Sequence, residues 1–121
     1  MPELIESPSR IPVPGGKSIN EYVGRVVNGE SVVSIAHMIA PGGWSEPAQT
    51  PEFDEYTLVL VGALHVETDA GPLVVRAGQA LISRAGERVR YSTPEGPGAS
   101  YVAVCLPAFS IDLVRRDDEG A

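Results

Sequence analysis

The stretch Pro41–Gly62 has the sequence PGGWSEPAQTPEFDEYTLVLVG. It combines a glycine turn, a polar loop and a glutamate, Glu55, that opens an apolar segment rich in Val and Leu, which is typical of a strand. This order indicates the mouth of a small barrel at which a carboxylate meets a polar loop. Histidine, a common ligand of metal sites, is absent from the stretch, which raises the question of whether such a site works without a metal.

Short strands punctuated by turns are expected on both sides of this stretch. Turn signals occur at Asn28-Gly29, at Ala70-Gly71, at Ala85-Gly86 and across 94–98. No segment has a sustained helical period. The expected strands cover residues 22–27, 31–39, 55–61, 63–68, 72–76, 79–84, 87–92 and 100–106. Eight such strands predict an all-β sandwich or barrel of the jelly-roll type over residues 21–110.

The two ends of the chain have a different composition. Residues 1–20 contain Pro2, Pro8, Pro12 and Pro14, which disfavour a helix and predict an extended arm. Residues 111–121 are expected to form a C-terminal tail with a short turn and a frayed end. The 121 residues fit one domain.

Composition narrows the partners and the compartment. The net charge of -7 argues against nucleic acid and against anionic membrane surfaces. The one cysteine, Cys105, excludes an internal disulfide and fits a reducing compartment. No apolar run approaches the length of a membrane span, and no signal-peptide pattern is present at the N-terminus, so we expect a cytoplasmic location.

Two spaced motifs give residues 30–107 a resemblance to the cupin superfamily. The first signature of that family is a Pro-Gly-Gly turn followed by a histidine-containing loop, a glutamate, six residues and a glycine; Pro41-Gly42-Gly43, Glu55 and Gly62 fit it. Gly78 and Gly86 fit the frame of the second signature, with Arg84 at a position where proline is usual. The resemblance implies a double-stranded β-helix, that is, a jelly-roll barrel with the extended N-terminal arm outside it. Phe53-Asp54-Glu55-Tyr56 is also similar to the ethanolamine-utilisation branch.

The chain departs from the family at the metal ligands. The first-signature histidines fall in the segment 48–51, which contains no histidine and offers Gln49 as a substitute ligand, and the second-signature histidine falls on Val89. A transition metal needs several converging N, O or S donors. We therefore expect no metal cofactor, and a divalent metal held by His37, Gln49, Glu55 and the loop acids is a third alternative.

Alternation along the strands predicts which side chains line the barrel. The parity on 31–39 is taken by analogy with cupins. The expected lining is Val33, Ile35, His37 and Ile39; Glu55, Thr57 and Val59; Ala80, Ile82 and Arg84; Val89 and Tyr91; and Tyr101, Ala103 and Cys105. Such a lining, apolar with a few polar groups, is typical of a small-molecule pocket.

His37 and Glu55 are the candidate catalytic residues. His37 interrupts an apolar row and is either a buried, hydrogen-bonded histidine or a proton-transfer group. Glu55 is either a solvated rim residue or a pocket carboxylate. Glu46, Glu52 and Asp54 are expected at a solvated rim.

The candidate substrate-binding residues are Gln49, Arg84, Tyr91, Tyr101 and Trp44. Arg84 has either Glu55 or an acidic ligand as its partner. The two tyrosines offer hydroxyls, with core packing as the alternative. Trp44 either covers the cavity or covers a dimer seam, and Cys105 is expected to be a structural buried thiol.

These residues lead to three alternative functions. The first is a small-molecule-binding cupin that performs acid/base catalysis, of isomerase, epimerase, cyclase or lyase type, on a small organic acid or a sugar-like substrate. The second is a non-catalytic binding or sensor module, and the third is a metal cupin with atypical ligands. Because small cupins commonly pair through barrel sheets, the resemblance also implies a homodimer.

Overall fold

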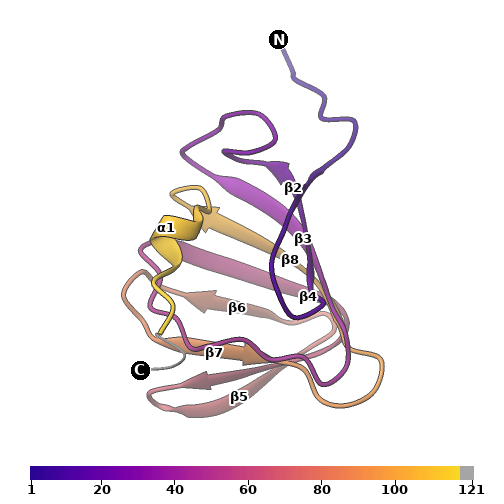
Figure 1. The fold of residues 1–121 in the computed structure, drawn as a ribbon, viewed down its shortest axis with the longest axis vertical. Helices are drawn as coiled ribbons and strands as arrows, with labels where there is room; N and C mark the ends of the chain where they lie inside the picture. The colour runs from indigo at the N-terminus through magenta and orange to yellow at the C-terminus, as the bar shows by residue number, and fades with distance from the viewer. Residues whose placement is uncertain (118–121) are drawn as a thin grey trace.

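The computed structural model of the protein describes residues 1–117 and is built almost entirely of antiparallel strands (Figure 1). The predicted jelly-roll fold is confirmed. The elements are β1 (Ser9–Ile11), β2 (Ser18–Val23), β3 (Ser34–Ala40), β4 (Asp54–Thr68), β5 (Gly71–Arg76), β6 (Ala80–Ser83), β7 (Val89–Ser92), β8 (Ala99–Leu106) and α1 (Ile111–Val114). The described residues contain no helix with both the length and the apolar character needed to span a bilayer.

Strand β4 links the two halves of the barrel. The expected strands 55–61 and 63–68 form this one element, with a shift of register between Val59 and Val61. Its first half pairs with β8 and β6, and its second half pairs with β5 and β7. The remaining order is β1-β2-β3-β8-β4, and Glu55, the second residue of β4, is paired on both sides, with Ser83 of β6 and with Cys105 of β8.

The glycines of the first signature permit the backbone to pack closely. Gly62 has a φ of 77°, and a Cβ added there would lie 2.0 Å from the carbonyl oxygen of Gly98. A Cβ on Gly42 would lie 2.0 Å from the carbonyl oxygen of Gly96. Neither position has room for a side chain. The close approach of the loop 96–98 therefore requires glycine at positions 42 and 62.

The expected strand 22–27 ends early. β2 stops at Val23, and residues 24–28 form a turn in which the amide of Asn28 donates to the carbonyl oxygen of Gly24 at 3.2 Å. The cause is Glu21, which is 1% exposed and accepts hydrogen bonds from the amides of Val26 and Val27 at 2.9 and 3.0 Å. A buried carboxylate that satisfies these two amides bends the chain away from the sheet.

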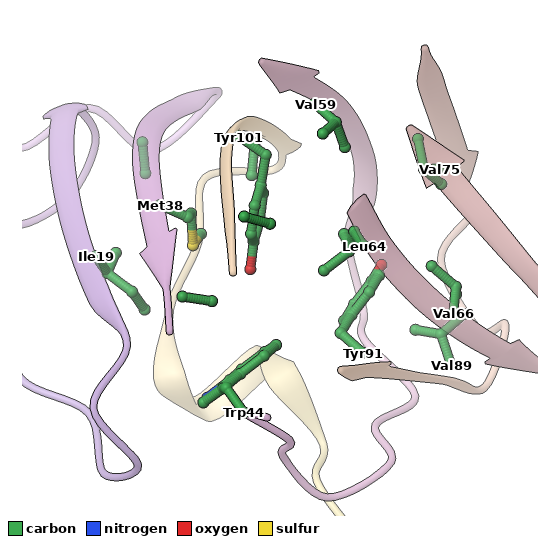
Figure 2. Packing of buried hydrophobic residues seen from close by; sticks show 14 residues of the cluster. Ile19, Met38, Trp44, Val59, Leu64, Val66, Val75, Val89, Tyr91 and Tyr101 are labelled. Carbon is green, nitrogen blue, oxygen red and sulfur yellow. The ribbon is translucent and has the colours of Figure 1, made fainter. Parts of the chain in front are cut away.

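The N-terminal segment expected as an extended arm contributes two strands to the sheet. β1 pairs with β2, and β2 begins at Ser18 and pairs with β3. The core lies between the strands, where Ile19, Met38, Leu64, Tyr91 and Tyr101 project towards one another (Figure 2). A second cluster, of Phe53, Cys105 and Val114, lies under α1.

The parity expected for two strands is wrong. On β3 the buried side chains are Ser34, Ala36, Met38 and Ala40, so Ile35, His37 and Ile39 lie on the outer face. On β6 the inward side chains are Leu81 and Ser83, and Ala80 and Ile82 are exposed. On β4, β7 and β8 the expected parity is confirmed for Glu55, Thr57, Val59, Val89, Tyr91, Tyr101, Ala103 and Cys105.

Candidate functional site

A narrow cavity of about 20 Å³ lies inside the barrel beneath the C-terminal segment. Its charged and amide side chains come from four separate parts of the chain. The lining residues are Lys17, Ile19, Met38, Glu46, Gln49, Phe53, Glu55, Tyr91, Tyr101, Cys105, Phe109 and Arg116. A cavity of this size has room for about one water molecule, so a larger ligand has to displace part of its wall.

Glu55 is held inside the cavity by the register of β4. It is 9% exposed, and the hydroxyl of Thr57 donates a hydrogen bond to its Oε2 at 3.4 Å. Burial raises the pKa of the Glu55 carboxyl to about 7, opposed by the positive charge of Lys17 and assisted by the negative charge of Glu46. Glu55 therefore changes its protonation state near neutral pH.

Lys17 supplies a buried cation and was not among the predicted site residues. The residue is 8% exposed, and its Nζ lies 4.7 Å from the ring centroid of Trp44 and 5.6 Å from that of Tyr101. Both distances are typical of cation–π contacts. Burial lowers the pKa of the ammonium, while Glu46 and then Glu55 oppose that shift.

The C-terminal strap, residues 108–117, closes the cavity by pairing with the loop 46–52. The amide of Thr50 donates to the carbonyl oxygen of Arg115 at 3.0 Å, and the amide of Asp117 donates to that of Ala48 at 2.8 Å. The backbone of Arg116 pairs with that of Gln49 in an isolated antiparallel β-bridge. The Arg116 guanidinium donates a hydrogen bond to Glu46 Oε2 at 3.3 Å.

Two expectations for these segments are therefore corrected. The Glu46 side chain is 9% exposed and is not a solvated rim residue. Of the tail expected to fray, Arg115 and Asp117 are hydrogen-bonded to the loop 46–52, and residues 118–121 lie outside the described part of the chain. The physical reason in both cases is the pairing of the strap with the loop, which covers Glu46.

Several predicted binding residues do meet at this place. Gln49, Tyr91 and Tyr101 line the cavity, and Trp44 is 4% exposed and lies under Lys17. Burial raises the pKa of both tyrosine hydroxyls well above their usual range, so they remain hydrogen-bond donors. Burial also raises the pKa of the Cys105 thiol, which therefore stays protonated.

His37 and Arg84 do not face the cavity, contrary to the sequence-based prediction. His37 lies on the outer face of β3, where its Nε2 is 2.7 Å from Ser100 Oγ. Arg84 has a side chain 57% exposed, and it donates to Tyr56 Oη at 2.8 Å and lies 3.8 Å from Asp54. Both residues face outward because the buried parity of β3 and β6 is the opposite of the predicted one.

The donors inside the barrel do not fit the transition-metal site that the fold family implies. Gln49 and Val89 stand opposite each other in a backbone bridge, with Glu55 in the same cavity, so the ligand positions offer one amide and one carboxyl. Within residues 1–117 no three His, Cys, Asp or Glu side chains come close enough to hold a metal ion. The buried ammonium of Lys17 opposes a further cation there.

The fold and the buried polar cavity define the class of protein: the chain has the cupin fold. It aligns with the polyketide cyclase RemF of Streptomyces resistomycificus (TM-score 0.77, 16% identity, 99% of this chain and 87% of that one). It also aligns with a putative ethanolamine utilisation protein EutQ of Salmonella typhimurium (TM-score 0.66, 22% identity, 77% and 71%) and with an oxalate decarboxylase of Bacillus subtilis (TM-score 0.75, 16% identity, 93% and 30%).

One curated protein is more similar in sequence. Over 108 residues the chain is 42% identical to the endoribonuclease YbeY of Myxococcus xanthus, a match that takes in 88% of this chain and 36% of that protein. The chain thus spans about a third of the length of the relative it matches. No protein-family model matches the chain.

Lys17 and Arg116 were not among the predicted site residues, and Glu46 was expected at the solvated rim. Lys17 follows the pair Gly15-Gly16 and precedes an alternating pattern in which Ile19 and Glu21 are also buried. That alternation places Lys17 on the inward parity, a signal available in the sequence once 18–23 is recognised as a strand. Nothing comparable marks Arg116, because its burial depends on a long-range contact with Glu46.

Proposed function

We propose that this chain is a small-molecule-binding cupin that performs acid/base catalysis on a small organic acid or sugar-like substrate. The reaction is of isomerase, epimerase, cyclase or lyase type and needs no transition metal. The observation that carries this proposal is the cavity carboxyl of Glu55, whose pKa of about 7 suits a group that both accepts and returns a proton at neutral pH.

The roles follow from the chemistry of the lining. Glu55 moves the proton at the reacting atom of the substrate. The ammonium of Lys17 stabilises negative charge that develops on a neighbouring oxygen. Tyr91 and Tyr101 donate hydrogen bonds that orient the substrate. His37 and Arg84 have no role in this scheme, since both lie outside the cavity.

The structural neighbours support this proposal only in a general way. RemF is described as a polyketide cyclase and another neighbour as an oxalate decarboxylase, so the same fold serves reactions of both kinds in other proteins. What favours proton transfer in this chain is its own cavity.

The test begins with a screen of small acids and sugars by thermal shift, because a ligand that binds the folded state raises its apparent stability. Ligands that bind are then assayed for turnover. We expect Glu55→Gln to lower kcat by about 10²- to 10⁴-fold and to remove an apparent pKa near 7 from the pH–rate profile. His37→Ala is the matched control and is expected to keep its activity. Full turnover by Glu55→Gln contradicts the proposal.

A second candidate function is a non-catalytic ligand-binding module within a larger protein. The similarity to 36% of a longer protein, an endoribonuclease, favours this alternative. In that protein the matching region is joined to further chain of other sequence. With a net charge of -7 the isolated chain is expected neither to bind nor to cleave RNA. Tight ligand binding without turnover supports this alternative, whereas RNA cleavage by the isolated 121-residue chain overturns it.

A further inference from the structure

Two polar atoms at the cavity are buried without a hydrogen-bond partner among residues 1–117. They are Oε1 of Gln49 and Nε of Arg116, and both residues line the cavity. Gln49 is only 5% exposed, so bulk water does not solvate its amide. The two residues are neighbours, because the loop and the strap pair at Gln49 and Arg116.

The two atoms have opposite hydrogen-bonding character. The amide oxygen of Gln49 is an acceptor and needs a donor such as a hydroxyl. The guanidinium Nε–H of Arg116 is a donor and needs an acceptor, for which a carboxylate is the strongest partner. Since buried polar groups in folded proteins are almost always satisfied, a molecule that carries both functions on adjacent atoms complements this pair.

The charges around the cavity favour an anion as that molecule. Lys17 and Arg116 are positive and Glu46 is negative. When Glu55 is protonated these four groups carry one excess positive charge, which a single carboxylate neutralises. When Glu55 ionises, the excess disappears, so an anion binds more tightly below neutral pH. Of the other titratable groups that face Glu55, Tyr91, Tyr101 and Cys105 stay protonated. Burial lowers the pKa of Lys17, so any proton it loses as the pH rises weakens anion binding in the same direction.

We infer that the cavity binds a small hydroxycarboxylate monoanion, with its carboxylate on Arg116 and Lys17 and its hydroxyl on Gln49. This inference rests on the proposed function and narrows its substrate class. A molecule of this size exceeds the cavity of about 20 Å³, so its binding requires the side chains of the cavity wall to shift while the loop and the strap stay paired at Gln49 and Arg116.

The experiment compares three matched probes by ligand-detected NMR and calorimetry at pH 6 and pH 8. Lactate carries both groups, propionate lacks the hydroxyl, and lactamide lacks the charge. We expect lactate to bind at least tenfold more tightly than propionate and lactamide to show no binding. The affinity for lactate is expected to be several-fold lower at pH 8 than at pH 6. Glycolate and longer hydroxy acids extend the series if the three-carbon probe is too short or too long.

Variants assign the two contacts. Gln49→Leu is expected to reduce the affinity for lactate to that for propionate. Arg116→Gln is expected to lower the affinity for both lactate and propionate and to leave the ratio of the two Kd values unchanged. Arg76→Gln replaces an exposed arginine of β5 that does not line the cavity and is the control, with Kd values within twofold of the unmodified chain. The melting temperature of each variant shows whether it is folded.

The outcomes separate this inference from the catalytic proposal. A preference for lactate without turnover of any substrate supports the inference and overturns catalysis. Turnover of a neutral sugar, with no preference among the three probes, supports catalysis and overturns the inference. Absence of binding by every hydroxy acid means that a water molecule alone satisfies Gln49 and Arg116, which also overturns the inference.

Discussion

The Nζ of Lys17 lies 3.8 Å from Oε2 of Glu46, and both side chains are less than one-tenth exposed. Lys17 precedes β2 and Glu46 belongs to the loop before β4, so this ion pair joins the N-terminal segment to the loop over the cavity. Glu46 also accepts a hydrogen bond from Arg116, so one carboxylate connects the beginning and the end of the described chain. A buried pair of this kind is sensitive to removal of either partner.

We expect Lys17→Met to lower the free energy of unfolding by about 1–3 kcal/mol, because Glu46 then keeps only Arg116 as its ionic partner. The same change is expected to raise the pKa of Glu55 further, since the positive charge that opposes its upward shift is gone. Denaturant unfolding measures the first effect, and NMR titration of the Glu55 carboxyl measures the second. Lys17→Arg keeps the charge and is the control. An unchanged Glu55 pKa in Lys17→Met contradicts this arrangement.

Glu55 is expected to make the protein less stable as the pH rises from about 5 to 8. Its pKa is raised in the folded state from 4.5 to about 7, so the folded chain binds its proton more tightly than the unfolded chain does. The stability from this proton is present below the unfolded pKa and is lost as the pH rises through the folded pKa. The shift corresponds to about 3 kcal/mol.

Glu55→Gln tests this directly, because the amide is uncharged at both pH values. We expect the variant to match the unmodified chain near pH 5 and to be more stable than it at pH 8, by up to about 3 kcal/mol. Lys17, whose pKa is lowered, contributes in the opposite direction, and it is present in both chains that are compared. Urea unfolding at pH 5, 6, 7 and 8 gives the slope. Parallel pH profiles for the two chains would contradict the position assigned to Glu55.

Strands β3 to β8 were predictable from the sequence, and the inward face was predictable on β4, β7 and β8 but not on β3 or β6. Glu55 opens β4 and Tyr91 lies in the short β7, and both faced the cavity as expected. In β3 the sequence SIAHMIA is apolar on both faces, because the outer face carries Ile35 and Ile39. Alternation cannot distinguish two apolar faces, so His37 was placed on the wrong one.

The missing members of the site have a different cause. Lys17 and Arg116 belong to segments that looked like an arm and a tail, and each reaches the cavity through contacts with Glu46 far away in sequence. Local patterns in a single sequence predict strands and turns, but they do not predict which charged residues far apart in the sequence form ion pairs. Pro14, Gly15 and Gly16, which made an arm plausible, also form the bend that directs Lys17 inward.

We expect removal of metal ions to leave the protein unaffected. Gln49, Val89 and Glu55 give too few donors for a transition metal, and Lys17 places a positive charge at the same cavity. Dialysis against a chelator, followed by addition of Zn²⁺, Mn²⁺, Ni²⁺ or Fe²⁺, is expected to leave the melting temperature unchanged. Elemental analysis of protein purified without added metal is the independent check. A stoichiometric metal that survives purification would restore the third alternative.

The outer face of the sheet is expected to form a homodimer interface. Ile35, Leu58 and Ile82 lie on it and are 37%, 45% and 53% exposed, and the register places Val104 and Tyr56 between Ile35 and Ile82. The charged side chains of this region, Asp54 and Arg84, lie at one end. Because the chain carries a net charge of -7, two copies repel each other least where they meet through an uncharged surface.

Size-exclusion chromatography with light scattering is expected to give twice the chain mass of 12.8 kDa. Leu58→Glu introduces a charge at the centre of the face and is expected to give the monomer with its fold intact, because Leu58 points away from the core. Leu73→Glu is the matched control: Leu73 is 40% exposed on β5, outside this face, and the variant is expected to remain dimeric. A monomeric unmodified chain would contradict the dimer. A dimer that survives Leu58→Glu and dissociates in Leu73→Glu would place the interface elsewhere.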